Sequence, residues 1–144
     1  MIKIVAAVAI FSFVLWLIAG PLEKSEKKRK TDKIADLFKD RPRLAPQQFY
    51  DSYFANQGYS ERVVLGVREV MAKILGTDLS FLKDSDDFSQ NLAFFWDFDS
   101  MANVELVQAL EEHFAIRIED LEAENTKTVR QLIDLVQSKV GTAI

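Results

Sequence analysis

The sequence predicts an all-α protein: a four-helix bundle, its third helix short, preceded by a single transmembrane helix and a helical stalk. Three observations lead to this fold class. An uncharged, apolar run extends from Ile4 to Gly20. Apolar residues recur at intervals of three and four near 61–75, 101–114 and 128–136, which is the pattern of amphipathic helices. No segment shows the alternation that is typical of a half-buried strand.

Changes of composition divide the 144 residues into three parts. We expect residues 1–22 to form the transmembrane anchor and residues 23–59 a basic juxtamembrane and aromatic helical stalk. Residues 60–140 then form the bundle. A chain of this length has room for one small domain with an appendage.

The first part is predicted to stay in the membrane as an uncleaved anchor. Its apolar run just reaches the length of about 17 residues that a helix needs to cross a bilayer, and Trp16 is placed to approach one interface. A cleaved signal peptide is disfavoured because Ala19-Gly20 is a poor cleavage site and Pro21 follows it. A buried helix of a soluble domain is disfavoured because the run is apolar on every face.

Basic residues directly after the apolar run predict its orientation. They are Lys24, Lys27, Lys28, Arg29, Lys30 and Lys33. Under the positive-inside rule they place the C-terminal domain on the cytoplasmic side of a single-pass membrane protein. The same cluster can bind anionic membrane lipids, at about 1 kcal/mol for each well-placed charge. A flank that only stops translocation, without affinity for lipids, fits the sequence equally well.

The net charge of −4 conceals an acidic C-terminal half. Between Asp78 and Glu124 there are thirteen carboxylates, against Lys83 and Arg117 as the only lysine or arginine. This distribution favours basic protein partners and argues against a nucleic-acid partner. Cysteine is absent, which excludes disulfides and thiolate metal sites.

The stalk and the bundle carry recognisable helix ends. Ala45 to Asn56 is predicted to be a short helix whose aromatic face packs on the bundle, although a binding surface is the alternative; this face consists of Phe49, Tyr50, Tyr53 and Phe54. Ser60 is the expected N-cap of a helix over 61–75, and Gly76 its C-terminal cap. Residues 77–99 form a long acidic connection. Thr128 and Gln131 form a capping box for the last helix.

The segment Asp99-Ser100-Met101 opens the acidic helix, whose expected apolar stripe continues at Val104, Val107, Leu110 and Phe114. By position alone, Ser100 is an ordinary helix cap. The segment and its helix, however, resemble the Asp-Ser-Leu motif and following helix of acyl carrier proteins. The resemblance continues through Ile116-Arg-Ile118, an acidic segment that ends at Glu124, and Thr128 to Val136, and covers about residues 60–140.

The resemblance implies that Ser100 carries covalent 4′-phosphopantetheine, transferred from coenzyme A by a phosphopantetheinyl transferase. Asp99 then helps to orient the transferase, or only caps the helix. Met101, Glu105, Glu111 and Glu112 correspond to the surface that carrier proteins offer to basic patches on acyl-transferring and acyl-modifying enzymes. An ordinary solvated helix face is the alternative for the glutamates. Without cysteine, the thiol of a thioester must come from the prosthetic group.

One segment departs from the family pattern. The usual Leu-Gly-x-Asp-Ser is replaced by Leu92-Ala-Phe-Phe-Trp-Asp-Phe-Asp-Ser100, which lacks the glycine and its freedom of backbone angles and adds aromatic residues. The alternatives for these aromatic side chains are inward packing, cover for an acyl chain, and contact with a membrane or partner. We expect Phe94 to be buried and Trp96 to be exposed.

No catalytic or metal pattern is present. His113, the only histidine, has no nucleophile or metal-ligand pattern around it, and Asp84 to Phe88 departs from the calcium-loop pattern. We therefore do not expect an enzyme. The resemblance, together with the predicted anchor, implies a membrane-anchored acyl carrier protein, which holds an acyl thioester at Ser100 for enzymes of lipid or fatty acid biosynthesis. The alternative is an unmodified carrier-like interaction subunit of a membrane complex.

Overall fold

The computed structural model describes residues 27–98 and 101–142. The chain forms two compact units, Met1–Lys39 and Asp40–Ile144. In the first unit, residues 27–37 form a helix in which the Thr31 hydroxyl donates to the Lys27 carbonyl at 2.9 Å. Among the described residues, no helix is both long enough and apolar enough to cross a membrane. The predicted span, Ile4 to Gly20, lies outside them.

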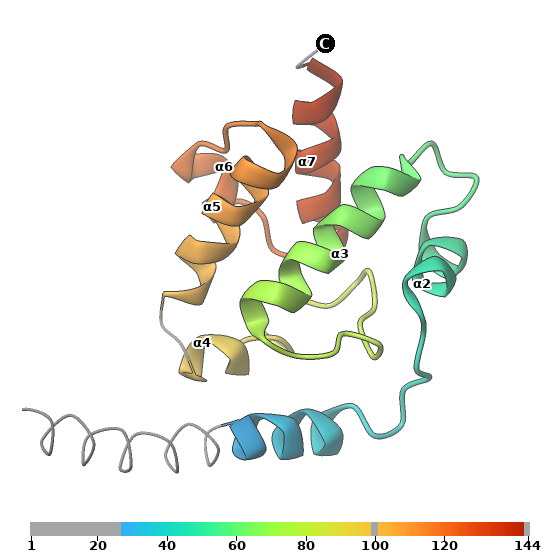
Figure 1. Ribbon diagram of the computed structural model, residues 1–144, viewed down its shortest axis with the longest axis vertical. Coiled ribbons are helices and arrows are strands. Elements are labelled where there is room, and N and C mark those ends of the chain that lie inside the picture. The colour runs from blue at the N-terminus through green and yellow to red at the C-terminus, as the bar shows by residue number, and fades with distance from the viewer. Residues whose placement is uncertain (1–26, 99–100, 143–144) are drawn as a thin grey trace, which may run out of the picture. The chain divides into compact units, whose positions relative to one another are not determined.

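The second unit is helical (Figure 1). Its elements are α2 (Pro46–Tyr53), α3 (Glu61–Leu75), α4 (Phe94–Phe98), α5 (Ala102–Phe114), α6 (Asp120–Glu124) and α7 (Val129–Thr142). Helix α3 runs through the middle and contacts α2, α5 and α7. Within the described ranges there is no β-strand, only an isolated bridge between Asp87 and Thr128. The predicted all-α class is confirmed, and the predicted bundle corresponds to α3, α5, the short α6 and α7.

The ends of α3 and α7 follow from local side-chain chemistry. The Ser60 hydroxyl accepts from the Val63 amide at 3.4 Å, and Gly76 closes α3 in the left-handed conformation with φ 63°. At the start of α7, the Gln131 amide donates to the Thr128 hydroxyl at 3.2 Å, and the Thr128 amide donates to Gln131 Oε1 at 3.3 Å. Each cap occupies backbone groups that a helix end otherwise leaves without partners. All three predicted caps are confirmed.

The buried face of α5 differs from the predicted one. Its buried residues are Ala102, Leu106, Leu110 and Phe114. Val104 is 42 % exposed and Val107 is half-buried, so the predicted stripe is wrong for its first half. The sequence offers two apolar sets with helical spacing, and contact with α3 selects the set that contains Leu106.

The aromatic segment 45–59 belongs to the same compact unit as the bundle. Phe49 and Phe54 are 0 % exposed, which confirms that the aromatic face packs inward. The unit begins at Asp40, whereas we predicted the bundle to begin at residue 60. The unit begins earlier than predicted because large aromatic side chains before residue 60 form part of its core.

The close approach of α3 and α5 depends on a glycine and gives a stability prediction. A Cβ atom at Gly66 would lie 2.7 Å from Cζ of Phe114, and Phe114 is only 6 % exposed, so its ring has little room to move. Gly66→Ala should therefore lower the free energy of unfolding by about 1–3 kcal/mol, as overpacking of a core does. Urea denaturation measures this change.

Gly141→Ala is the matched control. Gly141 also lies in a helix, α7, but a Cβ atom there would meet nothing within 4 Å. Alanine favours a helix over glycine, so this variant should be unchanged or up to about 1 kcal/mol more stable. Equal effects of the two substitutions would show that α3 and α5 do not make this contact.

Candidate functional site

The candidate site lies at the corner between α4 and α5. Asp99 and Ser100 themselves lie outside the described residues. The last residue of α4 is Phe98 and the first of α5 is Ala102, so two described helices, which contact each other, frame the Asp-Ser segment. In Figure 1 the two helices meet at one end of the unit.

Inward packing of two aromatic side chains anchors α4. Phe94 is 6 % and Phe95 2 % exposed, and Leu92 before them is 1 % exposed. The two phenyl rings lie with their centroids 4.2 Å apart. These side chains bury the apolar surface that the inserted residues bring, which confirms the prediction for Phe94. The side chain of Phe98 lies outside the described part.

Trp96 corrects a prediction, because it is not a free, exposed ring. It is half-buried, and its indole Nε1–H donates to the Phe88 carbonyl at 2.9 Å. Its ring centroid lies 6.2 Å from that of Phe88. A carbonyl of the preceding loop gives the indole the partner that a half-buried N–H requires. The insertion therefore continues the core and fixes the loop that leads to the Asp-Ser segment.

The first turn of α5 is open to solvent. Met101 occupies the N-cap position with no capping side-chain hydrogen bond and is 54 % exposed. The Val104 amide donates to Asn103 Oδ1 at 2.9 Å. The helix begins at Ala102, so that Met101 and not Ser100 occupies the N-cap position. The positive end of the helix dipole at this turn favours an anion such as a phosphodiester.

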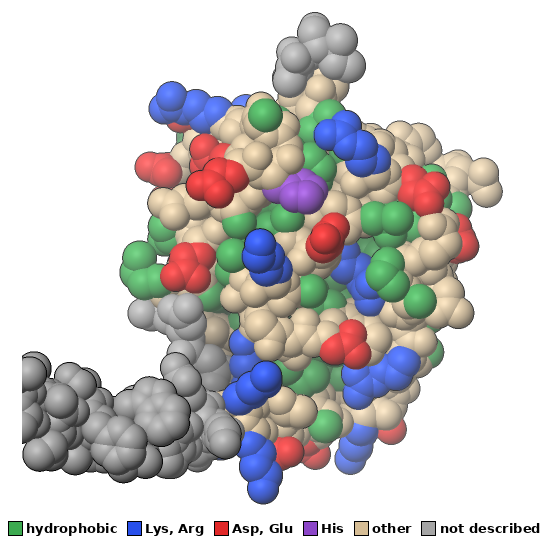
Figure 2. Space-filling view, viewed as in Figure 1, with side chains coloured by type: hydrophobic (Ala, Val, Ile, Leu, Met, Phe, Trp, Pro, Cys, Tyr) green, Lys and Arg blue, Asp and Glu red, His purple; other side chains and the backbone are tan. Residues whose placement is uncertain are grey.

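The predicted partner-binding residues share α5 with this turn. Glu105 and Glu112 are exposed and Glu111 is half-buried, and no described lysine or arginine forms an ion pair with any of the three. Figure 2 shows acidic side chains on the face formed by α5 and α6. The structure therefore leaves these three carboxylates open to a basic partner.

The acidic loop before α4 has a structural role. Asp86, 1 % exposed, accepts hydrogen bonds from Arg41 Nη1 at 2.7 Å, the Lys83 amide at 2.9 Å and Asn91 Nδ2 at 2.6 Å. Asp87 accepts from the amide and hydroxyl of Ser89, and these bonds lower the pKa of its carboxyl group. In the part of the chain that the structure describes, no three acidic, histidine or cysteine side chains form a metal site.

The sequence analysis did not predict the burial of two charged residues, although the sequence pattern around one of them indicates it. Arg68 is 7 % exposed; it follows Val64 by four residues and precedes Met71 by three, so its position on the apolar stripe of α3 indicated burial. Asp86 had no comparable signal, because its partners Arg41 and Asn91 come from distant or irregular segments.

Comparison with protein families gives a match that spans this corner. The model of a family described as "Phosphopantetheine attachment site" matches residues 66–136. The matched range contains the Asp-Ser segment, α4, α5 and α6, and most of α3 and α7. Residues 40–65, which belong to the same compact unit, precede the match.

Three similar proteins are each named as an acyl carrier protein. The acyl carrier protein of Acidothermus cellulolyticus is 32 % identical over 83 residues, which cover 58 % of this chain and 94 % of that protein. The acyl carrier protein of Thermosynechococcus vestitus is 36 % identical over 75 residues, which cover 52 % of this chain and 88 % of that protein. The acyl carrier protein of Exiguobacterium sibiricum is 35 % identical over 80 residues, which cover 56 % of this chain and 96 % of that protein.

The described residues beside the Asp-Ser segment are compatible with the prosthetic group of this family. The Met101 side chain at the start of α5 makes no capping hydrogen bond and is exposed, and the chain has no cysteine to supply the thiol of a thioester. The group is covalently attached 4′-phosphopantetheine, and the proteins that bear it are carriers rather than enzymes. Motif, helix order and relatives agree: this chain belongs to the acyl carrier protein family.

Proposed function

We propose that this protein is a membrane-anchored acyl carrier protein that holds an acyl group as a thioester on a 4′-phosphopantetheine arm at Ser100. It presents the group to partner enzymes at the membrane, in lipid or fatty acid biosynthesis. The observation that carries the proposal is the position of Asp99-Ser100-Met101 within the family match, directly before the exposed first turn of α5.

Each part of the corner has a role in this proposal. A phosphopantetheinyl transferase moves the arm from coenzyme A to the Ser100 hydroxyl, with Asp99 helping to orient the complex. The dipole of α5 favours the negative phosphodiester. The exposed side chains of Met101 and Val104, 54 % and 42 % accessible, leave the arm a free path to other active sites and offer apolar contact to partners.

Charge recognition directs the carrier to its partners. Glu105, Glu111 and Glu112 attract basic patches on acyl-transferring and acyl-modifying enzymes. Single exposed ion pairs are weak, so their main effect is to speed encounter and orient docking.

The anchor confines this exchange to a membrane surface. The apolar run from Ile4 to Gly20 serves as the span, and the basic residues after it place the carrier domain on the cytoplasmic side, where they also contact anionic membrane lipids. Tethering raises the effective concentration of the carrier for enzymes on the same membrane.

A second candidate is an unmodified, carrier-like interaction subunit of a membrane complex. The observation in its favour is α4. This helix replaces the glycine-containing turn of the family pattern, and the burial of Phe94 and Phe95 fixes it to the core. A transferase that reads the usual turn meets a different surface here.

The first test distinguishes the two candidates by modification. Co-expressed with a broad-specificity phosphopantetheinyl transferase, the protein should gain the mass of one phosphopantetheine in intact-mass spectra, because Ser100 is the acceptor. Ser100→Ala should abolish the gain, whereas Ser85→Ala, which changes an exposed serine of the acidic loop, should retain it. No gain with several transferases would favour the interaction subunit, and a gain that survives Ser100→Ala would place the arm elsewhere.

The acidic face gives a second prediction. Glu105→Lys combined with Glu111→Lys should weaken binding to the transferase about tenfold, because two attractive charges become repulsive. Wild-type affinity should also fall as salt rises, since exposed charges are screened beyond roughly 8 Å at physiological ionic strength. Glu69→Lys, an exposed glutamate on α3, is the control. Salt-independent binding, unaffected by the double substitution, would assign recognition to another surface.

The anchor gives a third prediction. The full-length protein should sediment with membranes and resist extraction by alkaline carbonate, because a spanning helix is held by its apolar surface. A tag at the C-terminus should be protected from external protease in intact cells. A variant without residues 1–22 should be extracted. Release of the full-length protein by carbonate would contradict the anchor, and digestion of the tag in intact cells would contradict its orientation.

A further inference from the structure

Two parts of this chain depart from the shared pattern of the family, and the structure joins them. Residues 40–65 precede the range matched by the family model, and α4 stands where the family pattern has a glycine-containing turn. Both parts belong to the second unit. The connection between them runs through the loop 83–91, and its centre is the carboxylate of Asp86.

Asp86 joins the segment before α2 to this loop. Its side chain is only 1 % exposed, and its Oδ2 accepts from Arg41 Nη1 at 2.7 Å and from the Lys83 amide at 2.9 Å. Its Oδ1 accepts from Asn91 Nδ2 at 2.6 Å. A buried carboxylate is costly unless a positive charge and hydrogen-bond donors replace its water. Arg41 supplies that charge from a segment that the family model does not include.

The contacts of Asp86 shape the loop directly before α4. Asn91, which donates to Asp86, also accepts from the Asp87 amide through its Oδ1 at 2.8 Å. The Leu92 amide donates to the Asp87 carbonyl at 3.0 Å. Two residues later, at Phe94, α4 begins. The buried carboxylate therefore helps to set the direction in which the chain enters this helix.

The same loop also holds α4 through Trp96. The indole Nε1–H of Trp96 donates to the Phe88 carbonyl at 2.9 Å, and the Phe88 amide donates to the Lys127 carbonyl at 2.9 Å, next to the start of α7. The hydrogen bond of Trp96 forms only if the loop presents the Phe88 carbonyl in this place. A change in the fold of the loop therefore reaches α4.

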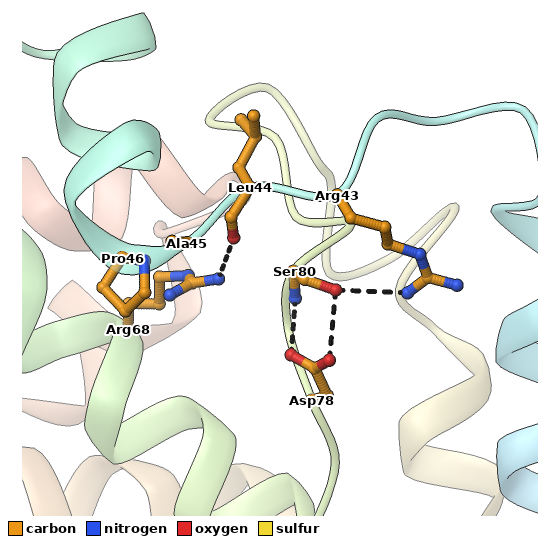
Figure 3. A pocket seen from close by; sticks show the side chains of 7 residues that line it. All are labelled: Arg43, Leu44, Ala45, Pro46, Arg68, Asp78 and Ser80. Atoms are coloured by element: carbon orange, nitrogen blue, oxygen red, sulfur yellow. Dashed lines mark hydrogen bonds between the residues drawn. The ribbon is translucent and has the colours of Figure 1, made fainter.

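The segment that carries Arg41 is itself fixed to the unit. Arg41 Nη1 also donates to the Phe81 carbonyl at 3.3 Å. The Leu44 amide donates to the Ser80 carbonyl at 2.8 Å. Arg68 Nη2 donates to the Leu44 carbonyl at 2.8 Å, as Figure 3 shows. These contacts hold the Arg41 guanidinium at the loop.

We propose that Arg41 is a positioning residue for α4, and that it acts through Asp86 on the surface on which a phosphopantetheinyl transferase docks beside Ser100. It balances the charge of the buried carboxylate, so the loop keeps the Phe88 carbonyl within reach of Trp96. The segment before residue 60 thereby compensates for the lost glycine turn. The docking role rests on the proposed function, whereas the effect on α4 does not.

Hydrogen exchange of the Trp96 indole N–H, followed by NMR, tests the effect on α4. The full chain is used with Trp16→Phe, so that one of its two tryptophans remains. Arg41→Gln should speed the exchange about fivefold or more, because the loop loses its counter-charge and the indole its acceptor. Arg43→Gln is the matched control: it changes an exposed arginine of the same segment, which donates to the Ser80 hydroxyl at 3.2 Å, and should leave the rate unchanged. Equal rates in the two variants would overturn the proposal.

A double variant tests whether Arg41 acts through Asp86. Arg41→Gln combined with Asp86→Asn should return the exchange rate towards the wild-type value, because a neutral amide needs no counter-charge. A double variant that exchanges as fast as Arg41→Gln would overturn this route. If Arg41→Gln alone does not fold, the double variant still decides: recovery of folded protein supports the coupling, and no recovery overturns it.

Transferase kinetics test the docking role. Arg41→Gln should raise the KM for the carrier about fivefold and keep kcat within about twofold, since the docking surface changes and the reacting groups do not. Equal KM values for the Arg41→Gln and Arg43→Gln variants would overturn the docking role. A wild-type protein that no transferase modifies would contradict the proposed function instead, and the indole exchange would still test the effect on α4.

Discussion

One guanidinium holds the segment before residue 60 against the carrier helices. From α7, Arg130 donates to Asp84 at 2.8 Å, to the Tyr53 carbonyl at 2.6 Å and to the Tyr59 hydroxyl at 3.0 Å, and it lies over the Phe54 ring, 4.6 Å from its centroid. It thereby joins α7, the acidic loop and the end of α2. The planar, five-donor geometry of arginine suits this many partners in a way that lysine does not. The burial of the aromatic face depends on this segment staying in place.

Features determined by local chemistry could be predicted from the sequence. The ends of α3 and α7 follow from Ser60, Gly76 and the Thr128–Gln131 pair, whose hydrogen bonds involve only residues within a turn. The buried face of α5 could not be predicted in the same way, because Val104 and Leu106 both continue a helical apolar pattern and only packing on α3 distinguishes them. The half-buried state of Trp96 depends on the Phe88 carbonyl, which the fold of the loop brings into reach.

The candidate site also combines features that the sequence predicts with features that depend on packing. The motif at Ser100 and the acidic residues of α5 were visible because they are contiguous in sequence or on one helix. The surroundings of the site were not, since α4 forms where the family pattern has a glycine turn, and its anchoring depends on contacts with the core. Arg68 donates a hydrogen bond to the Leu44 carbonyl, and periodicity along one helix does not reveal this pairing of residues from before and after residue 60. The sequence therefore predicts which residue carries the chemistry, and the structure shows which described residues lie near it in the fold.

Function depends on whether the altered corner between α4 and α5 still accepts the prosthetic group. Fragmentation of the intact protein, purified from the cells that naturally make it, tests this most directly by locating any added mass along the chain. The account predicts a phosphopantetheine, free or acylated, on fragments that contain Ser100 and on no others. A protein found only without added mass, or with the mass on another residue, would contradict it.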